Sequence, residues 1–365
     1  MKKRIVILSS VAAVILVVAI AAALILFPSL SSGNGETTTE ITTTQATTLP
    51  DTSHINKLTG LETLSDAAVG KRPIAIMVNN IKASLPQYGI YKADIMFEIP
   101  VEGGITRLMA LFGDYTKIPD VCSVRSCRYY FPIFAHGFDA VYFCFGINES
   151  LARPTVEKLG IDWFNGNDKY DQLIFGRDSE RLKKYSREHT AYVKGSAIPK
   201  ALKEYDVRSD ILEEKNNNFF NFRSKNKSAP AGDISCESVR LDFSKLYYST
   251  FTYDAEKKVY YKTHCGNKHM DSAVNKQLNY KNIFVLETEM SNYKGGSLVQ
   301  LDWNGGTGYY ISEGGARKIT WEKKNEASPI KFYGENGKQI KVNAGNSYIG
   351  VIGNGLTKIT GAAEK

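Results

Sequence analysis

An uninterrupted apolar run near the N-terminus constrains this chain more than any other feature of its sequence. Residues 5–27 contain no charged side chain, and a Lys-Lys-Arg cluster occupies positions 2–4. About 20 apolar helical residues span a bilayer, whereas the apolar part of a cleaved signal peptide has about 7–15. The length therefore favours an uncleaved transmembrane helix, with cleavage near the small residues 21–23 as the alternative. Because the basic cluster stays in the cytoplasm, we expect everything after Pro28 to lie outside the cell.

A threonine-rich stretch follows this anchor. Residues 31–54 carry almost no large apolar side chain, so we expect a flexible stalk after a cytoplasmic tip and anchor at 1–30. At roughly 100–200 residues per domain, the rest of the chain has room for two domains. The composition predicts an α/β domain at 55–208, a linker at 209–233 and a β-rich domain at 234–360.

Strand and helix patterns alternate in the first domain. Residues 73–78 form an apolar run typical of a buried strand, and 139–145 form another. The runs 93–101 and 105–112 flank Gly103-Gly104, which predicts a β-hairpin. Helices are expected at 129–136, 149–159, 179–184 and 197–205. This alternation predicts an α/β layer with a mixed sheet.

The second domain shows many short β-rich runs separated by turn signals such as Gly305-Gly306 and Gly314-Gly315. Regularly spaced short strands indicate a small antiparallel sandwich or barrel. The fold class predicted for the whole chain is α+β.

Charge and cysteine content limit the function classes. The 365 residues carry a formal charge of +8, which suits a surface facing anionic lipid or wall polymer and does not indicate nucleic acid. Five cysteines are too few for a disulfide scaffold, although Cys122 and Cys127 could bridge a loop. His264, Cys265 and His269 match no standard zinc spacing, so we expect no metal and no cofactor.

The predicted hairpin carries charged side chains. With Gly103-Gly104 as a two-residue turn, strand alternation places Glu98, Glu102 and Arg107 on one face, away from the core. They could orient a ligand, or they could form a solvent-side ion pair worth at most about 1 kcal/mol.

Two further arginines complete the candidate site. Arg125 and Arg128 flank Ser126, a favourable N-cap for the helix that follows. Donors of this kind suit a lipid pyrophosphate, a wall phosphate or a peptide carboxylate. We expect both arginines to share one anion pocket with Arg107 and His189, where His189 is either an acid–base group or a structural residue. The alternative is that the arginines cover a sheet edge and pair with glutamates.

Several segments resemble one bacterial family. They are 102–107 (EGGITR), 124–131 (VRSCRYYF), 188–190 (EHT), 268–271 (KHMD) and 327–333 (ASPIKFY). In these segments the chain resembles the YerB-like lipoprotein family of Firmicutes. The resemblance implies two domains of unknown function at the outer face of the membrane. Members of that family usually carry a lipidated cysteine where this chain has its apolar run.

These features predict a membrane-anchored, extracytoplasmic envelope protein that binds a wall component or an envelope enzyme without catalysis. An enzyme is the alternative, because the order of segments is similar to that of the LytR-CpsA-Psr phosphotransferases. That similarity implies a polyprenyl-phosphate-linked substrate and a divalent ion, with Asp94 and Arg125 at comparable places.

Overall fold

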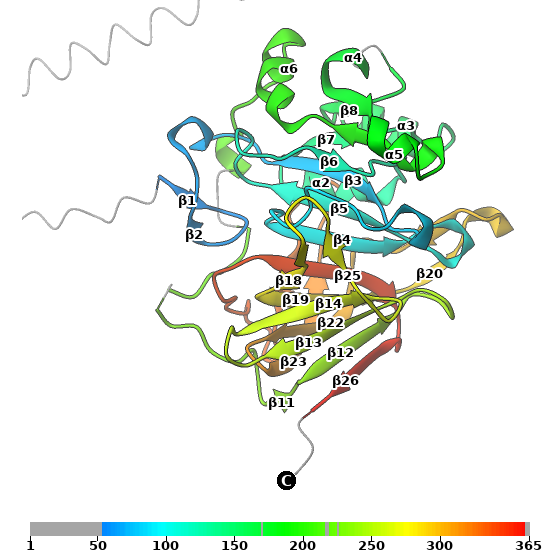
Figure 1. Ribbon diagram of the computed structural model, residues 1–365. Helices are drawn as coiled ribbons and strands as arrows, with labels where there is room; N and C mark the ends of the chain where they lie inside the picture. The colour runs from blue at the N-terminus through cyan, green and yellow to red at the C-terminus, as the bar shows by residue number, and fades with distance from the viewer. Residues whose placement is uncertain (1–52, 169–170, 216–218, 225, 362–365) are drawn as a thin grey trace, which may run out of the picture. The chain divides into compact units, whose positions relative to one another are not determined.

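A single mixed sheet runs through both halves of the chain (Figure 1). The computed structural model describes residues 53–168, 171–215, 219–224 and 226–361. In order across the sheet, the strands are β11 (Ile234–Ser235), β23 (Gly315–Glu322), β22 (Gly305–Ser312), β19 (Asn282–Thr288), β25 (Ser347–Gly353), β4 (Ile95–Pro100), β5 (Thr106–Phe112), β3 (Ile74–Asn79), β7 (Val141–Cys144) and β8 (Trp163–Asn165), and β24 (Lys331–Tyr333) pairs with β23.

The two halves join where β25 lies between β19 and β4. β25 is parallel to both neighbours, with Ser347 opposite Ile95 at the start of the junction. The second domain is β-rich as predicted, but the expectation of an antiparallel sandwich or barrel is wrong at β25, which pairs in parallel with β19. A central parallel strand must be apolar on both faces, and all but the last residue of β25 are buried. The protein is a two-domain α+β structure whose domains share one sheet.

Side-chain alternation divides the N-terminal part of this sheet into two buried faces. Ala75 and Met77 of β3 pack with α2 and α3 on one face, while Ile76 and Val78 pack against a small sheet and α6 on the other. The helices are α2 (Tyr130–His136), α3 (Ala152–Lys158), α4 (Asp171–Ile174), α5 (Ser179–Leu182) and α6 (Ile198–Glu204), and the small sheet contains β6 (Val121–Cys122), β10 (Ala191–Val193) and β9 (Phe175–Arg177).

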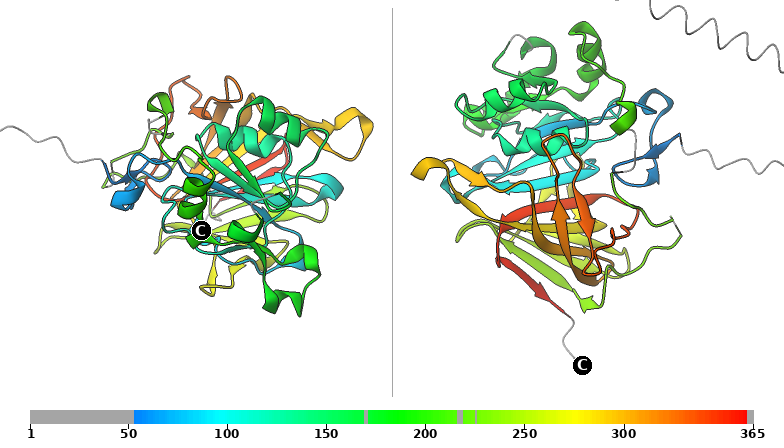
Figure 2. Two further views of the ribbon diagram at one scale, coloured as in Figure 1. Left: turned by 90° about the horizontal axis from the view of Figure 1, so that it is seen from above. Right: turned by 180° about the vertical axis from the view of Figure 1, so that it is seen from behind.

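A second sheet packs against the large sheet in the C-terminal half; it faces the viewer in Figure 1 and lies behind the orange strands of the large sheet in the rear view of Figure 2. Its strands are β15 (Asn267–Lys268), β14 (Val259–His264), β13 (Tyr248–Asp254), β12 (Ser238–Asp242) and β26 (Thr357–Thr360), with β18 (Asn279–Tyr280) beside β14. Leu241 and Phe251 of this sheet lie in one core cluster with Met96 and Tyr348 of the large sheet.

Three short strand pairs complete the fold. They are β1 (Ile55–Asn56) with β2 (Leu61–Glu62), β16 (Met270–Asp271) with β17 (Lys276–Gln277), and β20 (Met290–Asn292) with β21 (Val299–Leu301). The predicted strand at 339–342 does not form, and the helix predicted at 149–159 is shortened to α3.

The predicted anchor at 5–27 and nearly all of the stalk at 31–54 lie outside the described residues. Within the described residues, no helix is long and apolar enough to cross a membrane.

Candidate functional site

The hairpin formed by β4 and β5 decides which charged residues can meet. Five residues, 101–105, separate its strands, and Gly103 lies in the middle with a φ of 71°. The observed pairing sets Ile99 opposite Arg107 and Glu98 opposite Leu108. Directly paired residues share a face, so Glu98 and Arg107 point to opposite sides of the sheet. The expectation that they share one face, away from the core, is wrong, and both faces are buried.

Arg107 contacts the segment that opens α2. Its Nη1 donates to the Ser126 carbonyl oxygen at 2.6 Å, while the Ser126 hydroxyl donates to the Phe145 carbonyl oxygen at 3.2 Å. Arg128, two residues later, forms an ion pair with Glu102 in the hairpin turn. Ser126 makes no helix cap, because α2 begins at Tyr130 after Tyr129 as its N-cap residue. The structure therefore positions the arginines by chain packing rather than at a helix N-terminus.

Arg125 and His189 meet through one carboxylate. Arg125 Nη2 donates to Glu188 Oε2 at 2.9 Å, and Glu188 Oε1 lies 3.6 Å from His189 Nε2. The Asn79 amide lies 3.1 Å from His189 Nδ1, and Asn79 also pairs with Arg107 in the sheet. These contacts bring the four predicted anion-site residues into one neighbourhood, which we call the arginine cluster: Arg107, Arg125, Arg128 and His189, with Glu102, Glu188 and Asn79.

The arginine cluster holds more positive than negative charge. Three guanidinium groups face two carboxylates, and no carboxylate of the described residues lies within 4.0 Å of Arg107. Burial, followed by the charges of Arg128 and Arg125, lowers the pKa of Arg107 to about 10. Arg125 Nε is buried and has no hydrogen-bond partner among the described residues. Burial and the nearby Arg125 charge also lower the pKa of His189, which favours its neutral form.

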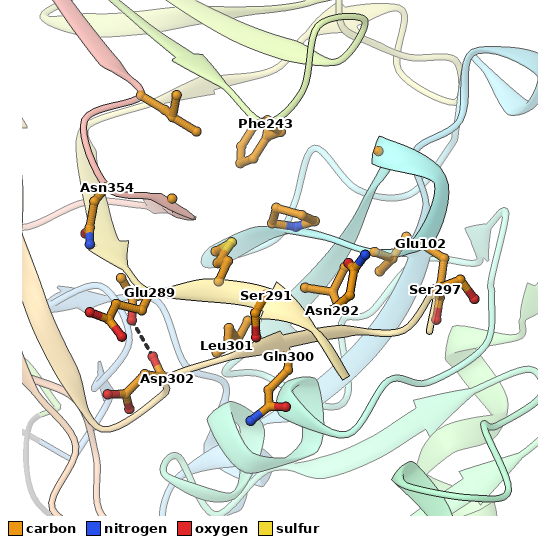
Figure 3. A pocket seen from close by; sticks show the side chains of 18 of the residues that line it. Glu102, Phe243, Glu289, Ser291, Asn292, Ser297, Gln300, Leu301, Asp302 and Asn354 are labelled. Atoms are coloured by element: carbon orange, nitrogen blue, oxygen red, sulfur yellow. Dashed lines mark hydrogen bonds between the residues drawn. The ribbon is translucent and has the colours of Figure 1, made fainter. Parts of the chain in front are cut away.

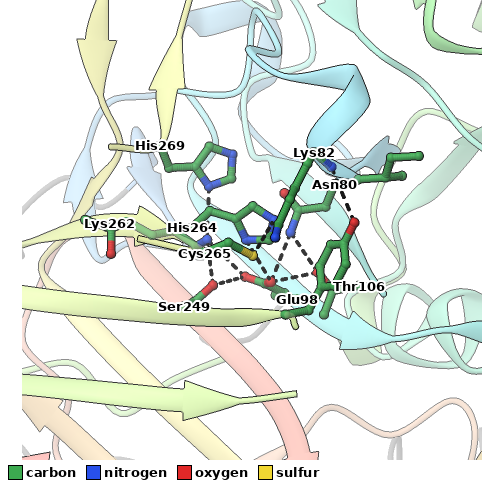
Figure 4. Close-up of polar contacts among 12 residues, drawn as sticks. Asn80, Lys82, Glu98, Thr106, Ser249, Lys262, His264, Cys265 and His269 are labelled. Carbon is green, nitrogen blue, oxygen red and sulfur yellow. Dashed lines mark hydrogen bonds and ion pairs between the residues drawn. The ribbon is translucent and has the colours of Figure 1, made fainter. Parts of the chain in front are cut away.

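Glu98 belongs to a different group of residues, on the other side of the sheet (Figure 4). Its Oε2 accepts hydrogen bonds from Ser249 Oγ at 2.9 Å and Tyr348 hydroxyl at 2.8 Å, and it lies 3.1 Å from Lys262 Nζ. Its Oε1 accepts hydrogen bonds from Asn80 Nδ2 and Thr106 Oγ1. The expectation that Glu98 supports the arginines is therefore wrong.

Lys262 extends this group, which we call the buried ion-pair cluster. Its ammonium also donates to Ser249 Oγ at 2.8 Å and to His269 Nδ1 at 3.0 Å, and His269 Nε2 donates to Gln87 Oε1 at 2.9 Å. Burial raises the pKa of Glu98, but the Lys262 charge and the hydrogen bonds it accepts hold that pKa below its ordinary value. Burial lowers the pKa of His264, beside the pair, to about 4. Glu98 and Lys262 are fully buried, so this ion pair joins the two domains. His264 and His269, beside the pair, line a separate pocket of about 350 Å³.

Asp94 lies far along the hairpin from the arginines. It precedes β4, whose first residue pairs with Leu111, and its carboxylate accepts a hydrogen bond from the Gly113 amide at 2.7 Å. Arg107 lies near the other end of β5. Asp94 therefore does not support the arginines, although this was expected of it. The described residues contain no group of three His, Cys, Asp or Glu side chains suited to a metal.

The cysteines of the candidate site are free. Cys122 and Cys127 are both buried thiols, so the structure contains no disulfide between them. Burial raises the pKa of each thiol to about 12, which leaves neither as a thiolate nucleophile at neutral pH.

A groove of about 1130 Å³ lies beside the arginine cluster (Figure 3). Its walls are the 100–104 turn of the first domain, the β20–β21 hairpin and residues 353–356 of the second. Glu102 lines this groove and also binds Arg128, so it connects the groove to the arginine cluster.

Comparison with known proteins follows the same two-domain division. Residues 58–208 match the domain described as "Protein of unknown function (DUF3048) N-terminal domain", and residues 239–349 match the corresponding C-terminal domain. The chain belongs to the DUF3048 family. A curated relative is "Putative lipoprotein YerB" of Bacillus subtilis (strain 168), 28% identical over 84% of this chain and 89% of its own. The crystal structure of YerB from Bacillus subtilis has a TM-score of 0.71 at 25% identity, covering 83% of this chain and 98% of that chain.

These matches confirm the YerB-like resemblance inferred from the sequence. The first DUF3048 domain contains every residue of the arginine cluster, and the groove lies where its 100–104 turn meets the second domain.

Sequence reasoning missed several residues. Asn79 and Asn80 directly follow the apolar run at 73–78 and carry no functional signal in the sequence, yet they contact His189 and Glu98 respectively. Glu188 stands in the 188–190 segment, and nothing in the sequence marks it as a link between Arg125 and His189. Lys262 carried one usable signal, because alternation along β14 places it on the same face as Tyr260 and His264.

Proposed function

We propose that this DUF3048 protein is a membrane-anchored, extracytoplasmic envelope protein that binds an anionic wall component at the arginine cluster without catalysis. The ligand class is a phosphate- or carboxylate-bearing wall polymer. An anion of this kind matches guanidinium donors in both charge and geometry.

The burial of Arg107 carries this proposal. The residue is only 6% exposed, has no carboxylate within 4.0 Å among the described residues, and lies near the charges of Arg125 and Arg128. A buried charge without an opposite partner is costly, and proteins normally pair it. The charge of Glu102 also acts on Arg107, but Glu102 is already paired with Arg128, so a bound anion would supply further negative charge.

The membrane attachment rests on the sequence and on the relative. Residues 5–27 are long enough for a single transmembrane helix, with the basic cluster at 2–4 on the cytoplasmic side. The name of the B. subtilis relative describes a lipoprotein, which is a membrane-attached class. We infer that an apolar helix does in this chain what a lipid does in such proteins.

A binding role agrees with the chemistry of the cluster. The Ser126 hydroxyl donates to the Phe145 carbonyl oxygen, and His189 is held by Asn79 and Glu188. His189 is thus not paired with the nucleophile of an acyl- or phosphoryl-transfer site.

Co-sedimentation of the detergent-solubilised full chain with isolated Gram-positive cell walls tests the proposal. We expect wild type to sediment with native walls and to stay in solution with walls stripped of phosphate and carboxylate polymers. Arg125→Gln should weaken binding about tenfold or more, because a charge-assisted hydrogen bond is worth roughly 1.5–3 kcal/mol.

The matched control is Arg153→Gln, since Arg153 also pairs with a glutamate, Glu149, at similar exposure. Equal sedimentation of wild type with native and stripped walls would refute an anionic ligand. So would equal weakening by the Arg125 and Arg153 substitutions.

A further inference from the structure

The side chains that line the groove differ in charge from those of the arginine cluster. Its charged side chains are three carboxylates, from Glu102, Glu289 and Asp302, and no lysine, arginine or histidine lines it. A phosphate would be repelled from this surface, so an anionic group belongs at the arginines and not in the groove.

Several lining side chains, Glu289 among them, have unused hydrogen-bonding groups. The side chains of Glu289, Asn292, Gln300 and Asn354 make no hydrogen bond to another described residue, and all four are exposed. Figure 3 shows Asn292 and Gln300 on the β20–β21 hairpin, Glu289 just before it and Asn354 on the segment after β25. Amide groups both donate and accept, and carboxylates accept, which is the complement that sugar hydroxyls require.

Apolar side chains also line the groove. Met290 and Val299 are partly exposed in it, and Phe243 and Leu301 lie behind them as buried lining residues. The carbon face of a sugar ring buries its apolar area against such side chains while its hydroxyls bind the polar ones.

Two contacts tie the groove to the arginine cluster. Glu102 lines the groove and pairs with Arg128, and the Tyr129 hydroxyl lies 3.3 Å from the Leu301 amide of the hairpin. A ligand in the groove is therefore next to the arginine segment.

We propose that the groove binds the sugar residues of a wall glycan whose anionic substituent binds at the arginine cluster. This inference rests on the proposed function and adds the ligand class and a second binding surface. The groove, which is acidic and rich in amides, binds the sugars, and the arginine cluster binds the anionic substituent of the same polymer. The Glu102–Arg128 ion pair joins the two surfaces.

Titration calorimetry on the detergent-solubilised full chain separates the two surfaces. The probes are a neutral N-acetylglucosamine trisaccharide and inorganic phosphate. We expect Asn292→Ala with Gln300→Ala to weaken trisaccharide binding at least tenfold and to leave phosphate binding unchanged. Arg125→Gln should weaken phosphate binding and leave trisaccharide binding unchanged. Gln339→Ala is the control, because Gln339 is exposed and does not line the groove.

Three results would overturn the inference. The first is that wild-type protein binds phosphate but not the trisaccharide. That result would overturn the sugar site and leave the proposed anion site intact. Another is trisaccharide binding that the groove substitutions do not change. The third is displacement of the trisaccharide by a trilysine peptide at lower concentration, which would assign the acidic groove to basic peptides.

Discussion

Glu98 Oε2 lies 3.1 Å from Lys262 Nζ, and neither side chain has any solvent-exposed area. Glu98 comes from β4 in the first domain and Lys262 from β14 in the second. Breaking a buried pair leaves an uncompensated charge, which costs roughly 3–5 kcal/mol. This pair therefore makes the stability of each domain depend on the other.

We predict that Lys262→Met lowers the free energy of unfolding by about 3–5 kcal/mol, measured by urea titration. The double variant Glu98→Gln with Lys262→Met should recover a large part of that loss, since it leaves no buried charge. Additive losses from the two substitutions would contradict this account.

Acid should destabilise the protein through His264. Burial and the Lys262 charge lower the pKa of His264 to about 4 in the folded chain, against 6.5 for an unperturbed histidine. Between these values the unfolded chain binds a proton that the folded chain does not, so stability falls as pH decreases from 6.5 to 4. The loss reaches about 3 kcal/mol at 1.36 kcal/mol per pKa unit.

Unfolding free energies at pH 7 and pH 4.5 test this for wild type and His264→Gln. The variant should lose about 2–3 kcal/mol less than wild type between the two pH values. If wild type and His264→Gln lose the same unfolding free energy between the two pH values, other groups cause the loss of stability in acid.

One of the five cysteines should react faster with a thiol reagent than the other four. Cys265 is half-buried, while Cys122, Cys127, Cys144 and Cys236 are buried free thiols. We predict that Ellman's reagent titrates one thiol rapidly in the native protein and five in guanidinium chloride without reductant. Fewer than five thiols after unfolding would reveal a disulfide that the structure does not contain.

The predicted topology can be tested on intact protoplasts. External protease should digest the two DUF3048 domains, since the basic cluster at 2–4 is expected to hold the N-terminus in the cytoplasm. Protection of residues 55–365 in intact protoplasts, with digestion after lysis, would contradict an extracytoplasmic location.

Local sequence patterns predicted part of the fold well. The apolar run at 73–78 forms β3, the Gly-Gly hairpin forms β4 and β5, and the segment at 129–136 forms α2. The junction of β25 with β4 was not predictable, because it joins positions about 250 residues apart and no local pattern specifies such a partner.

The candidate site, like the fold, could be predicted from the sequence only in part. Arg107, Arg125, Arg128 and His189 do lie together, but the hairpin register was expected from a two-residue turn. The five-residue turn moves the pairing by one residue, and a one-residue shift exchanges the faces of a strand. That shift alone takes Glu98 from the arginines to Lys262. The groove had no local signal, because its walls come from three separate segments.

The most direct test of the central claim is a calorimetric titration of inorganic phosphate into the full chain and into Arg125→Gln and Arg153→Gln. Binding at the arginine cluster predicts that wild type and Arg153→Gln bind equally and that Arg125→Gln binds at least tenfold more weakly, with all three equally folded. Absence of phosphate binding by wild type, or equal affinity of all three proteins, would contradict the proposal that these arginines form an anion site.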